Sequence, residues 1–342
     1  MAWGDSEKWH YNTSKYLRSK GHSVHNVTTH GSELSKKLLN SNFKPYYLKV
    51  GGFSYINPIK KIKLTKLFSK LNLDSIILNC HNDAKLVGLI ANNLKIKKVI
   101  FRRVINNPIK PTRRNLKIYK RYITDFIANS REAKRSIYKN IRSLKSKISI
   151  IYNGVDLHEI PRLKPIQSKV IIGNLGRLVE QNGHINLIEV AKVLKNKEIQ
   201  FEIHIAGTGP MKEKLNTLIK KEDLSDEVKL LGNVENKDFL NSVDICVFPS
   251  LFEGLTNIML EAQLYQKPTV AFNTASNNEV ITHGYNGLLI PPCNTNLMAS
   301  ALDTLSKSNL VQNWFQKNSL NILNEKFNQK RMTSKLEELL EL

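Results

Sequence analysis

Short apolar runs alternate with segments of helical spacing along the second half of the chain. The run at 169–174 is apolar, and residues 185–194 then place apolar side chains three and four positions apart, as on one face of a helix. The run at 201–206 alternates like a strand and ends at Gly207, and Pro210 suits the first turn of a following helix. Further strands are expected at 228–231, 244–248, 268–272 and 287–290. This alternation predicts right-handed βαβ crossovers and a parallel sheet covered on both faces.

The first half of the chain follows the same rhythm less regularly. Strands are expected at 23–28, 46–50, 75–79, 98–102, 125–128 and 148–151. Helices are expected at 6–19, 32–39, 59–71, 83–94 and 131–141. A doubly wound domain normally begins with a strand, whereas this sequence enters a helix almost at once. The first domain therefore either starts unusually or lacks its first strand in this sequence.

The length of 342 residues fits two domains of roughly 150 residues each. Pro161 and Pro165 interrupt the pattern near the middle, so we expect a first domain at 1–160 and a second at 161–325, followed by a terminal segment at 326–342. No apolar run reaches the ~18 residues of a transmembrane helix, and no secretory signal opens the sequence. Three scattered cysteines fit a reducing cytosol better than a disulfide framework or a zinc site.

Positive charge is concentrated in the first half of the chain. The whole sequence has 52 basic and 29 acidic side chains, a formal balance of +23. Residues 1–165 contain 34 basic and 9 acidic side chains, whereas residues 166–342 contain 18 and 20. Between Lys95 and Lys147 only Asp125 and Glu132 oppose 18 basic residues. Charge of this kind is typical either of a solvated face or of a surface for an anionic partner, namely nucleic acid, phospholipid or an anionic acceptor molecule.

Three loops of the second domain carry distinctive residues. They span 176–183, 207–210 and 249–261, and each follows an expected strand. Because ligands bind beyond the carboxyl ends of parallel strands, we expect the three loops to face one crevice. Arg177 would offer a permanently charged guanidinium to a phosphate there. A helix that opens after Gly254 would add backbone N–H groups and a positive dipole end.

Two carboxylates in the last of these loops have a regular spacing. Glu253 and Glu261 stand eight residues apart, slightly over two helical turns, so they project to the same side of a helix. Paired carboxylates accept hydrogen bonds from sugar or ribose hydroxyl groups. Each feature alone also fits an ordinary surface loop or a chance spacing.

The run from Pro249 to Ala262 resembles the signature of the family-4 retaining glycosyltransferases, which have the GT-B architecture. That architecture consists of two Rossmann-like, doubly wound α/β domains that face a cleft. Three further motifs resemble the family and occur in the family order: the Gly176-Arg177 loop, the Ala206–Pro210 loop and the Asn153–Asp156 hinge. The resemblance also implies that the terminal segment is a helix that returns to the first domain.

The resemblance implies a nucleotide-sugar site in the second domain. Glu261 would hold the ribose and Arg177 the diphosphate, with Gly207 in an adjoining loop. The donor sugar would be held by Glu253, Gly254, Leu255, Thr256 and Asn257.

One position of the phosphate loop departs from the family. Asn182 stands where the family usually has a lysine before the glycine, which should weaken stabilisation of the leaving diphosphate. His184 or a basic residue of the first domain would be the replacement cation.

The resemblance in the first domain covers fewer residues. Gly4 opens a segment similar to the Gly-Gly-x-Glu loop of these enzymes, although Asp5 replaces the second glycine. His81 matches the position of a histidine close to the donor sugar, so Glu253, His81 and Arg177 are the expected catalytic residues. Gly4, Arg102 and Arg103 are expected to bind an anionic acceptor, and His30 is a weaker candidate.

The resemblance implies a retaining glycosyltransferase that moves a hexosyl or related group from a UDP-, GDP- or ADP-sugar. The expected acceptor is a lipopolysaccharide core, a lipid-linked sugar or a surface polysaccharide, in the setting of bacterial lipopolysaccharide biosynthesis. The sequence has no Asp-x-Asp motif, so neither a metal nor another cofactor is expected. The mechanism would be a same-face displacement assisted by the leaving phosphate.

Two other functions were weighed against the transferase. A degenerate, inactive transferase kept as a binding module fits Asn182 and Asp5. A nucleic-acid-binding protein fits the charge, but the basic stretch contains no recognisable nucleic-acid-binding motif, so nucleic acid is not the expected partner. With the acceptor domain carrying the charge, we expect a cytoplasmic enzyme that sits peripherally on the anionic inner face of the cell membrane.

Overall fold

The computed structural model describes residues 4–51, 53–104, 109–157, 169–251, 255–274 and 276–340. The chain divides into unit 1, Met1–Asn153 with Lys330–Leu342, and unit 2, Gly154–Gln329. The first division thus falls at Asn153, a few residues before the expected position 160. Two backbone hydrogen bonds explain the difference, since Val155 N donates to Phe327 O at 2.8 Å and Gln329 N donates to Val155 O at 3.0 Å.

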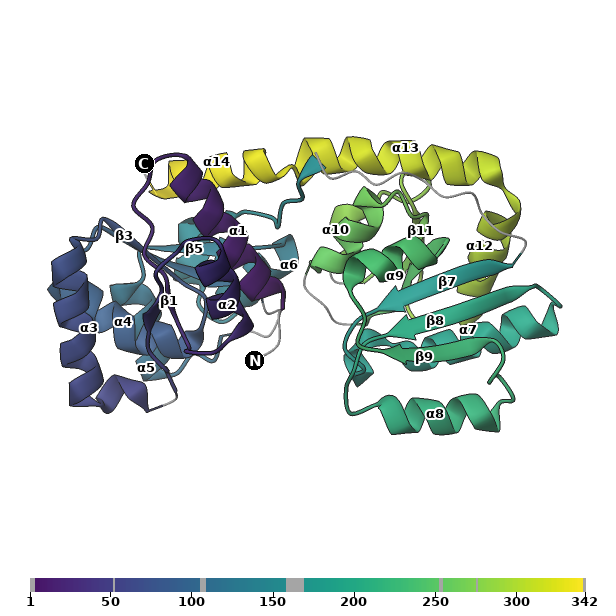
Figure 1. Ribbon diagram of the computed structural model, residues 1–342, viewed down its shortest axis with the longest axis horizontal. Helices are drawn as coiled ribbons and strands as arrows, with labels where there is room; N and C mark the ends of the chain where they lie inside the picture. Colours follow the sequence, from purple (N-terminus) through teal and green to yellow (C-terminus); the bar gives the residue numbers. More distant parts are fainter. Residues whose placement is uncertain are drawn as a thin grey trace. The chain divides into compact units, whose positions relative to one another are not determined.

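Unit 2 contains a six-stranded, all-parallel sheet with the strand order β12-β11-β10-β7-β8-β9 (Figure 1). Its strands are β7 (Val170–Leu175), β8 (Phe201–Ala206), β9 (Val228–Gly232), β10 (Ile245–Phe248), β11 (Thr269–Phe272) and β12 (Leu288–Ile290). Its helices are α7 (His184–Asn196), α8 (Lys212–Lys221), α9 (Asn236–Ser242), α10 (Asn257–Leu264), α11 (Asn277–Val280), α12 (Thr295–Lys307) and α13 (Asn309–Lys326). The order reverses between β7 and β10, which is the switch point of a doubly wound sheet.

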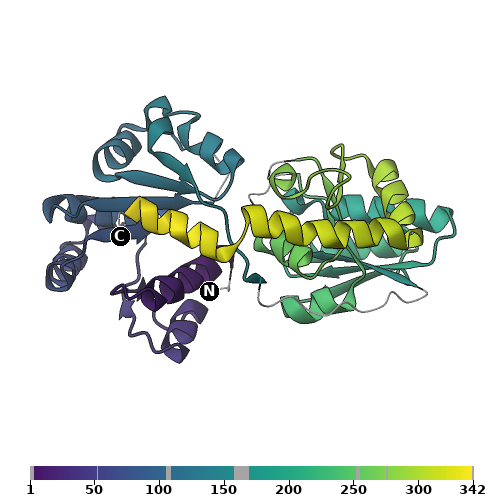
Figure 2. The same cartoon turned by 90° about the horizontal axis from the view of Figure 1, so that it is seen from above.

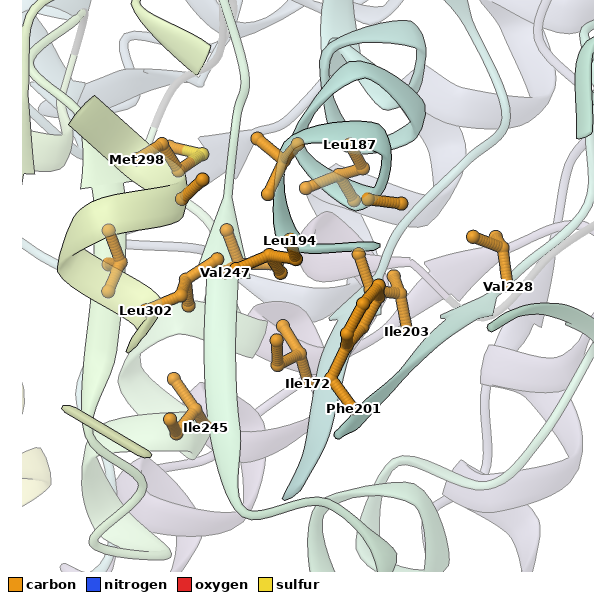
Figure 3. Packing of buried hydrophobic residues seen from close by; sticks show 14 of the residues in the cluster. Ile172, Leu187, Leu194, Phe201, Ile203, Val228, Ile245, Val247, Met298 and Leu302 are labelled. Carbon is orange, nitrogen blue, oxygen red and sulfur yellow. The ribbon is translucent and has the colours of Figure 1, made fainter. Parts of the chain in front are cut away.

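The core of unit 2 lies between the sheet and helices α7 and α12 (Figure 3). Ile172, Ile203 and Val247 of three neighbouring strands are at most 2% exposed. They pack with Leu187 of α7 and Met298 of α12, both fully buried. Each such side chain contributes about 1.5–3 kcal/mol relative to exposure, so the sheet is a firm base for the loops at its edge.

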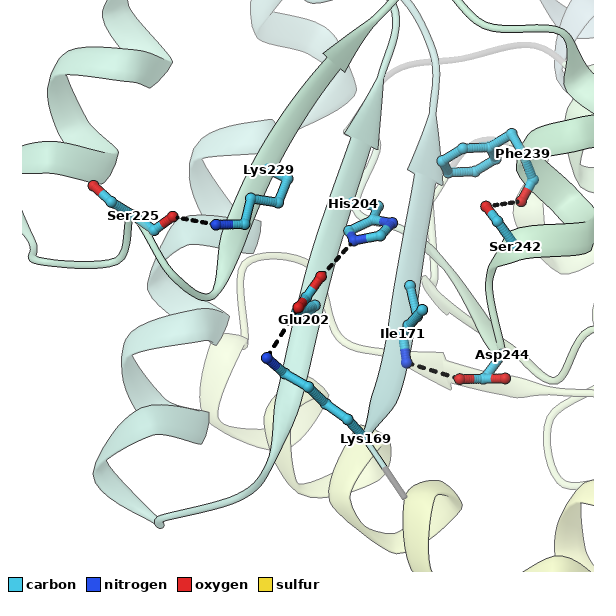
Figure 4. A network of polar contacts seen from close by, with 9 residues as sticks. All are labelled: Lys169, Ile171, Glu202, His204, Ser225, Lys229, Phe239, Ser242 and Asp244. Atoms are coloured by element: carbon cyan, nitrogen blue, oxygen red, sulfur yellow. Dashed lines mark hydrogen bonds and ion pairs between the residues drawn. The ribbon is translucent and has the colours of Figure 1, made fainter. Parts of the chain in front are cut away.

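Polar contacts tie the first residues of the unit 2 strands together (Figure 4). Glu202 accepts hydrogen bonds from Lys169 at 2.9 Å and from His204 at 2.7 Å. These partners lower the pKa of the Glu202 carboxyl, Lys169 having the larger effect. The Asp244 carboxylate accepts from Ile171 N at 2.8 Å. Because these contacts cluster toward the amino ends of the strands, they lie away from the loops that follow the carboxyl ends.

Unit 1 contains a four-stranded parallel sheet, β3-β4-β5-β6, and a separate parallel pair, β1-β2. The strands are β1 (Val27–Thr28), β2 (Tyr46–Tyr47), β3 (Ser75–Leu78), β4 (Lys98–Arg103), β5 (Asp125–Ala128) and β6 (Ile148–Ile150). The helices are α1 (Asp5–Ser19), α2 (Glu33–Asn40), α3 (Pro58–Leu71), α4 (His81–Asn93), α5 (Arg113–Lys117), α6 (Arg131–Tyr138) and α14 (Gln329–Leu340). Short helical turns are η1 (Ser54–Ile56), η3 (Arg142–Lys147) and, in unit 2, η5 (Glu180–Asn182).

Local sequence signals account for several helix starts in unit 1. Asn57 accepts a hydrogen bond from Lys60 N at 3.0 Å, and Pro58 occupies the first turn of α3. Ser130 caps α6 in the same way by accepting from Ala133 N at 2.9 Å. Helix α5 and the π-helix η2 (Ile118–Tyr122) that continues it were not predicted.

The last helix of the chain, α14, packs inside unit 1 (Figure 2). Met332, Leu336 and Leu340 are buried in one apolar cluster with Leu17 of α1 and Ile100 of β4. These three residues recur at intervals of four, so one face of the helix supplies the contact.

Candidate functional site

The loops that follow β7, β8 and β10 are joined to one another by backbone hydrogen bonds. We call residues 176–183, 207–210 and 249–251 the carboxyl-edge loops. Gly176 N donates to Ala206 O at 3.0 Å, and Leu178 N donates to Thr208 O at 2.9 Å. Leu251 N donates to Gln181 O at 2.9 Å and links the third loop. The structure therefore brings together the three loops that the sequence analysis singled out.

Two glycines make this close approach of the loops feasible. Gly207 has φ +133°, and a Cβ there would lie 1.9 Å from the Gly176 carbonyl oxygen. Gly183 has φ +70°, and its Cβ would lie 2.0 Å from the Pro249 carbonyl oxygen. Any other residue would force backbone apart at both points, so the shape of the site depends on these two positions.

Arg177 is exposed while its backbone is held in place. Asn182, which is 5% exposed, donates from Nδ2 to the Arg177 carbonyl oxygen at 3.0 Å. In the described part of the chain the Arg177 guanidinium makes no hydrogen bond or ion pair. Its loop is thus fixed and its charge is available to an anion. Asn182 turns its amide to the backbone, which accounts for an uncharged residue at this position.

His184 does not supply the positive charge that Asn182 lacks. Its side chain is 2% exposed, and burial lowers the pKa of the imidazole to about 4. The ring is therefore neutral at physiological pH. The prediction that His184 replaces the missing cation is wrong.

Glu261 lies in α10 and is positioned by a residue that the sequence analysis missed. Asn236 Nδ2 donates to Glu261 Oε2 at 2.6 Å. Asn236 is the first residue of α9, which follows β9. The signal available in the sequence was its place after a strand, since the loops of all parallel strands gather at the same edge.

The start of α10 provides further groups beside Glu261. Thr256 is the N-cap residue, and its side chain does not cap the helix, so the first-turn N–H groups are not satisfied by it. Asn257 opens the helix, and Leu255 is 3% exposed. Glu253 and Gly254, the remaining predicted residues of this segment, lie outside the described residues.

In unit 1, His81 is hydrogen-bonded to a tyrosine that the sequence analysis did not select. His81 is the first residue of α4, at the carboxyl end of β3, and its Nδ1 is paired with the Tyr119 hydroxyl. Tyr119 is fully buried, and its ring packs on Phe101 and Phe126 at centroid distances of 5.4 and 5.8 Å. A buried aromatic ring of this kind is a rigid support for the imidazole.

The π-helix η2 brings Tyr119 to this place. It packs against α4, where a Cβ on Gly88 would lie 2.9 Å from Tyr122 Cβ. π-Helical segments are rare and frequent at functional sites. The signal missed in the sequence was therefore a backbone irregularity, which no side-chain periodicity reveals.

Arg103 belongs to the same group of residues. It ends β4, and its charge counteracts the effect of burial, which raises the pKa of the Tyr119 hydroxyl to about 12. Burial, followed by the charges of Lys85 and Arg103, lowers the pKa of His81. The imidazole is accordingly neutral near pH 7, and two predicted residues, His81 and Arg103, meet around Tyr119.

Arg102 is held inside unit 1 instead of facing solvent. It is 1% exposed, its guanidinium lies 4.2 Å from the Trp9 ring centroid, and Nη2 donates to Asn153 Oδ1 at 3.0 Å. Burial lowers its pKa to about 9, and the charges of Asp5 and Glu7 oppose that change. Direct contact between Arg102 and an acceptor, as predicted, does not fit this burial.

Gly4 and His30 occupy different surroundings. Gly4 is the extended N-cap residue of α1, and a Cβ there would lie 3.1 Å from the Glu7 carboxylate. The segment from Gly4 to Glu7 therefore lies near Arg102, whose pKa both acidic residues of the segment affect. His30 instead packs edge-on against Tyr47 at 4.9 Å. Across the described ranges, no group of three His, Cys, Asp or Glu side chains is arranged to hold a metal ion.

Two parallel α/β units with a loop cluster at the switch point define the GT-B glycosyltransferase class. Residues 158–321 match the family described as glycosyl transferases group 1, and residues 6–159 match Glycosyltransferase Family 4. The two matches together span most of the chain. Each half of the chain thus matches a glycosyltransferase family model, which confirms the fold and family expected from its motifs.

Similar sequences are found among curated glycosyltransferases. An uncharacterized glycosyltransferase of Haemophilus influenzae is 28% identical over 88% of this chain and 86% of its own length. The capsular polysaccharide biosynthesis glycosyltransferase CapH of Staphylococcus aureus is 26% identical over 82% of this chain and 81% of its length. An uncharacterized glycosyltransferase of Methanocaldococcus jannaschii is 29% identical over 61% of this chain, which spans only 58% of that protein.

Solved structures share the fold. A glycosyltransferase of Rickettsia africae has a TM-score of 0.86 at 19% identity, covering 99% of this chain and 95% of its own. Anabaena HepE in complex with UDP-glucose has a TM-score of 0.83 at 17% identity, covering 99% of this chain and 96% of its own.

Proposed function

We propose that the chain is a retaining glycosyltransferase that binds a nucleotide-sugar in unit 2 and an anionic sugar acceptor in unit 1. One observation carries the proposal: the carboxyl-edge loops hold Arg177 exposed at the switch point of the sheet, and none of the described residues pairs with its guanidinium. The complex of HepE with UDP-glucose supports a UDP-sugar as the first donor to try. GDP- and ADP-sugars are the other candidates.

In this proposal each part of the donor meets a suitable group. Arg177 binds the diphosphate, and Gly207 and Asn182 keep its loop in shape. Glu261, held by Asn236, accepts hydrogen bonds from the ribose hydroxyls. Donor sugar hydroxyls are bound at the start of α10 by Leu255, Thr256 and Asn257, together with Glu253 and Gly254 as the family resemblance implies.

The acceptor is assigned to unit 1, which carries the positive charge. Arg103 is the residue that would meet an acidic acceptor, and His81 would donate a hydrogen bond to a sugar hydroxyl. Arg102 takes a positioning role because it links Trp9 to Asn153. Gly4 keeps the opening of α1 free of a side chain. The name of CapH supports a surface polysaccharide as the acceptor class. A lipopolysaccharide core or a lipid-linked sugar would offer the same kind of acceptor group, a sugar hydroxyl.

The proposed reaction is a displacement on one face of the sugar. The acceptor oxygen forms a bond to the anomeric carbon as the bond from that carbon to the diphosphate breaks. The acceptor proton passes to the departing phosphate oxygen, and Arg177 stabilises the charge that develops there. We propose that no metal or other cofactor takes part, so EDTA should leave the rate unchanged.

The cellular setting is proposed on charge alone. A basic unit 1 fits a cytoplasmic enzyme on the anionic inner face of the membrane. A degenerate transferase remains the second candidate, because Asn182 removes a cation from the phosphate loop.

Calorimetric titration with UDP tests the donor site. Arg177→Ala should lower UDP affinity about 10- to 100-fold, the value of one or two charge-assisted hydrogen bonds. Glu261→Ala should also weaken binding, whereas Lys212→Ala on the exposed face of α8 should not. UDP binding that ignores both site variants would contradict the site.

A screen of nucleotide-sugars with mass detection of the product then separates the two candidate functions. Transfer to a core oligosaccharide or lipid-linked acceptor supports the enzyme. UDP binding without hydrolysis or transfer of any donor would favour the degenerate module.

A further inference from the structure

Unit 1 exposes several large apolar side chains within one short segment. Phe53 is 78% exposed, Ile56 59%, Ile59 74% and Ile62 57%. Phe53 precedes η1, Ile56 ends it, and Ile59 and Ile62 lie in the first turns of α3. Helix α3 is an outer helix of unit 1 beside α4 (Figure 1). Single exposed apolar residues need no explanation, but a contiguous group marks an interaction site.

The exposed face of α3 continues this group with lysines. Ile59, Ile62, Lys63, Lys66 and Lys70 recur at intervals of three and four and therefore line one side of the helix. The opposite side carries Leu64 and Phe68, which are buried in the core of unit 1. Helix α3 thus has an apolar buried face and a second face that is apolar at its start and cationic toward its end.

No acidic residue balances these lysines in the surrounding sequence. Nine lysines and no Asp or Glu occur between Glu33 and Asp74. Over the described ranges, Lys63, Lys66 and Lys70 make no ion pair. The charge is therefore left for a partner outside the molecule.

A pocket of 470 Å³ lies next to this face, between α3 and β2. Its walls are mostly apolar and include Tyr46, Leu48, Leu64 and Leu67. Lys63, Lys66 and Lys70 line it as well. Apolar walls with adjoining ammonium groups match a molecule that joins a hydrocarbon chain to a phosphate.

We propose that η1 and α3 form a docking surface for an anionic phospholipid membrane, which we call the α3 surface. Phe53, Ile56, Ile59 and Ile62 enter the boundary of headgroups and acyl chains, while Lys63, Lys66 and Lys70 bind lipid phosphates. Interfacial helices combine these features, and their binding depends on both buried apolar area and attraction to anionic lipid. Nucleic acid would use the lysines but not the isoleucines. The inference rests on the membrane setting proposed above and specifies the residues that make contact.

Vesicle sedimentation tests the α3 surface with the full chain. The protein should bind vesicles of equal parts phosphatidylglycerol and phosphatidylcholine at low salt, and lose binding on pure phosphatidylcholine or at high salt. The triple variant K63Q/K66Q/K70Q should lower the partition coefficient about 100-fold, since each lysine near an anionic leaflet should contribute an equal part of that binding. I59S/I62S should also weaken binding to anionic vesicles at low salt, although it leaves the charge unchanged.

Matched control variants distinguish the effect of the α3 surface from that of net charge or of exposed apolar side chains elsewhere. K212Q/K214Q/K220Q on α8 changes the net charge by the same amount, and L297S/L310S replaces two exposed leucines of unit 2. Both should bind vesicles like the unchanged protein. Equal losses in the control variants would overturn the proposal.

Insertion is measured separately with Phe53→Trp. Its emission, corrected for the three native tryptophans, should shift to the blue and be quenched by brominated lipid. Quenching confined to the native residues, or vesicle binding unchanged in I59S/I62S, would refute insertion and leave a general polyanion site. UDP titration keeps the two proposals apart. The α3-surface variants should retain UDP affinity while they lose vesicle binding. An unchanged protein that binds UDP but not anionic vesicles would refute only the α3 surface, and one that binds vesicles but not UDP would refute only the donor site.

Discussion

Tyr119 gives His81 a defined hydrogen-bonding state. The Tyr119 hydroxyl is buried and has His81 Nδ1 as its hydrogen-bond partner. A buried O–H group that donates no hydrogen bond destabilises the folded state, so the phenol donates and Nδ1 accepts. The proton of the neutral imidazole is then on Nε2, where it can be donated to a sugar hydroxyl.

Tyr119→Phe should therefore release the ring of His81 without unfolding unit 1. We expect the Nδ1–H tautomer to become populated and kcat to fall about 2- to 10-fold, the value of one hydrogen bond. Nitrogen-15 NMR of the imidazole reports the tautomer directly. Tyr138→Phe, a partly buried tyrosine of α6, is the control. An unchanged tautomer in Tyr119→Phe would show that Tyr119 does not position His81.

The carboxyl-edge loops form one structural element although they are far apart in the sequence. Their backbones touch where Gly207 meets Gly176 and where Gly183 meets Pro249. The packing of the three loops determines the position of Arg177, because hydrogen bonds from Asn182 and Leu178 fix the loop that carries it.

Gly207→Ala should disrupt this element. The new Cβ would lie 1.9 Å from the Gly176 carbonyl oxygen at a backbone angle that favours glycine. We expect UDP affinity to fall at least ~10-fold, because the phosphate loop must move. Gly284→Ala introduces the same kind of backbone strain at φ +76° with no atom within 4 Å, so it should retain UDP affinity. Equal UDP affinities in the two variants would argue against loop packing as the determinant.

Most elements were predictable, and the exceptions have physical causes. Strands β3 to β12 appear where short apolar runs were found, because burial on both faces of a parallel sheet demands such runs. Helix α4 begins at His81 and not at Asp83, since a helix end depends on backbone geometry more than on apolar spacing. The π-helix η2 has no sequence signature and was missed.

At the scale of the whole molecule, the last helix of the chain belongs to the same unit as the first half of the sequence. Helix α14 buries Leu336 among residues of α1, β4 and β5. Unit 1 is consequently built from both ends of the sequence, while unit 2 is continuous. The stability of unit 1 should therefore depend on residues near the C-terminus.

Leu336→Ala should lower the free energy of unfolding of unit 1 by about 2–5 kcal/mol, because the 1% exposed side chain leaves a cavity. Urea unfolding, followed separately in each unit by hydrogen exchange, measures the effect. Glu338→Ala, on the exposed side of the same helix, is the control. UDP affinity, a property of unit 2, should stay unchanged; a parallel loss of stability in unit 2 would contradict this division.

The distribution of positive charge is also a property of the whole molecule, and the structure shows where part of it lies. The sequence placed the excess in the first domain. The α3 surface accounts for only part of that excess, because Lys63, Lys66 and Lys70 are the only basic residues assigned to it. It combines them with exposed isoleucines. Charge counting does not distinguish such a face from a uniformly solvated one.

The sequence by itself determined the α/β class, the two-domain organisation and the three loops, and it suggested Arg177 and Glu261 as candidate site residues. These follow from local periodicity and from turn residues, which are encoded within a few positions. The tertiary structure decided the partners: Tyr119 for His81, Asn236 for Glu261, and the interior of unit 1 for Arg102. Such pairs join residues 25 or more positions apart. Their contact depends on how helices pack on the sheets, and no local pattern contains that information.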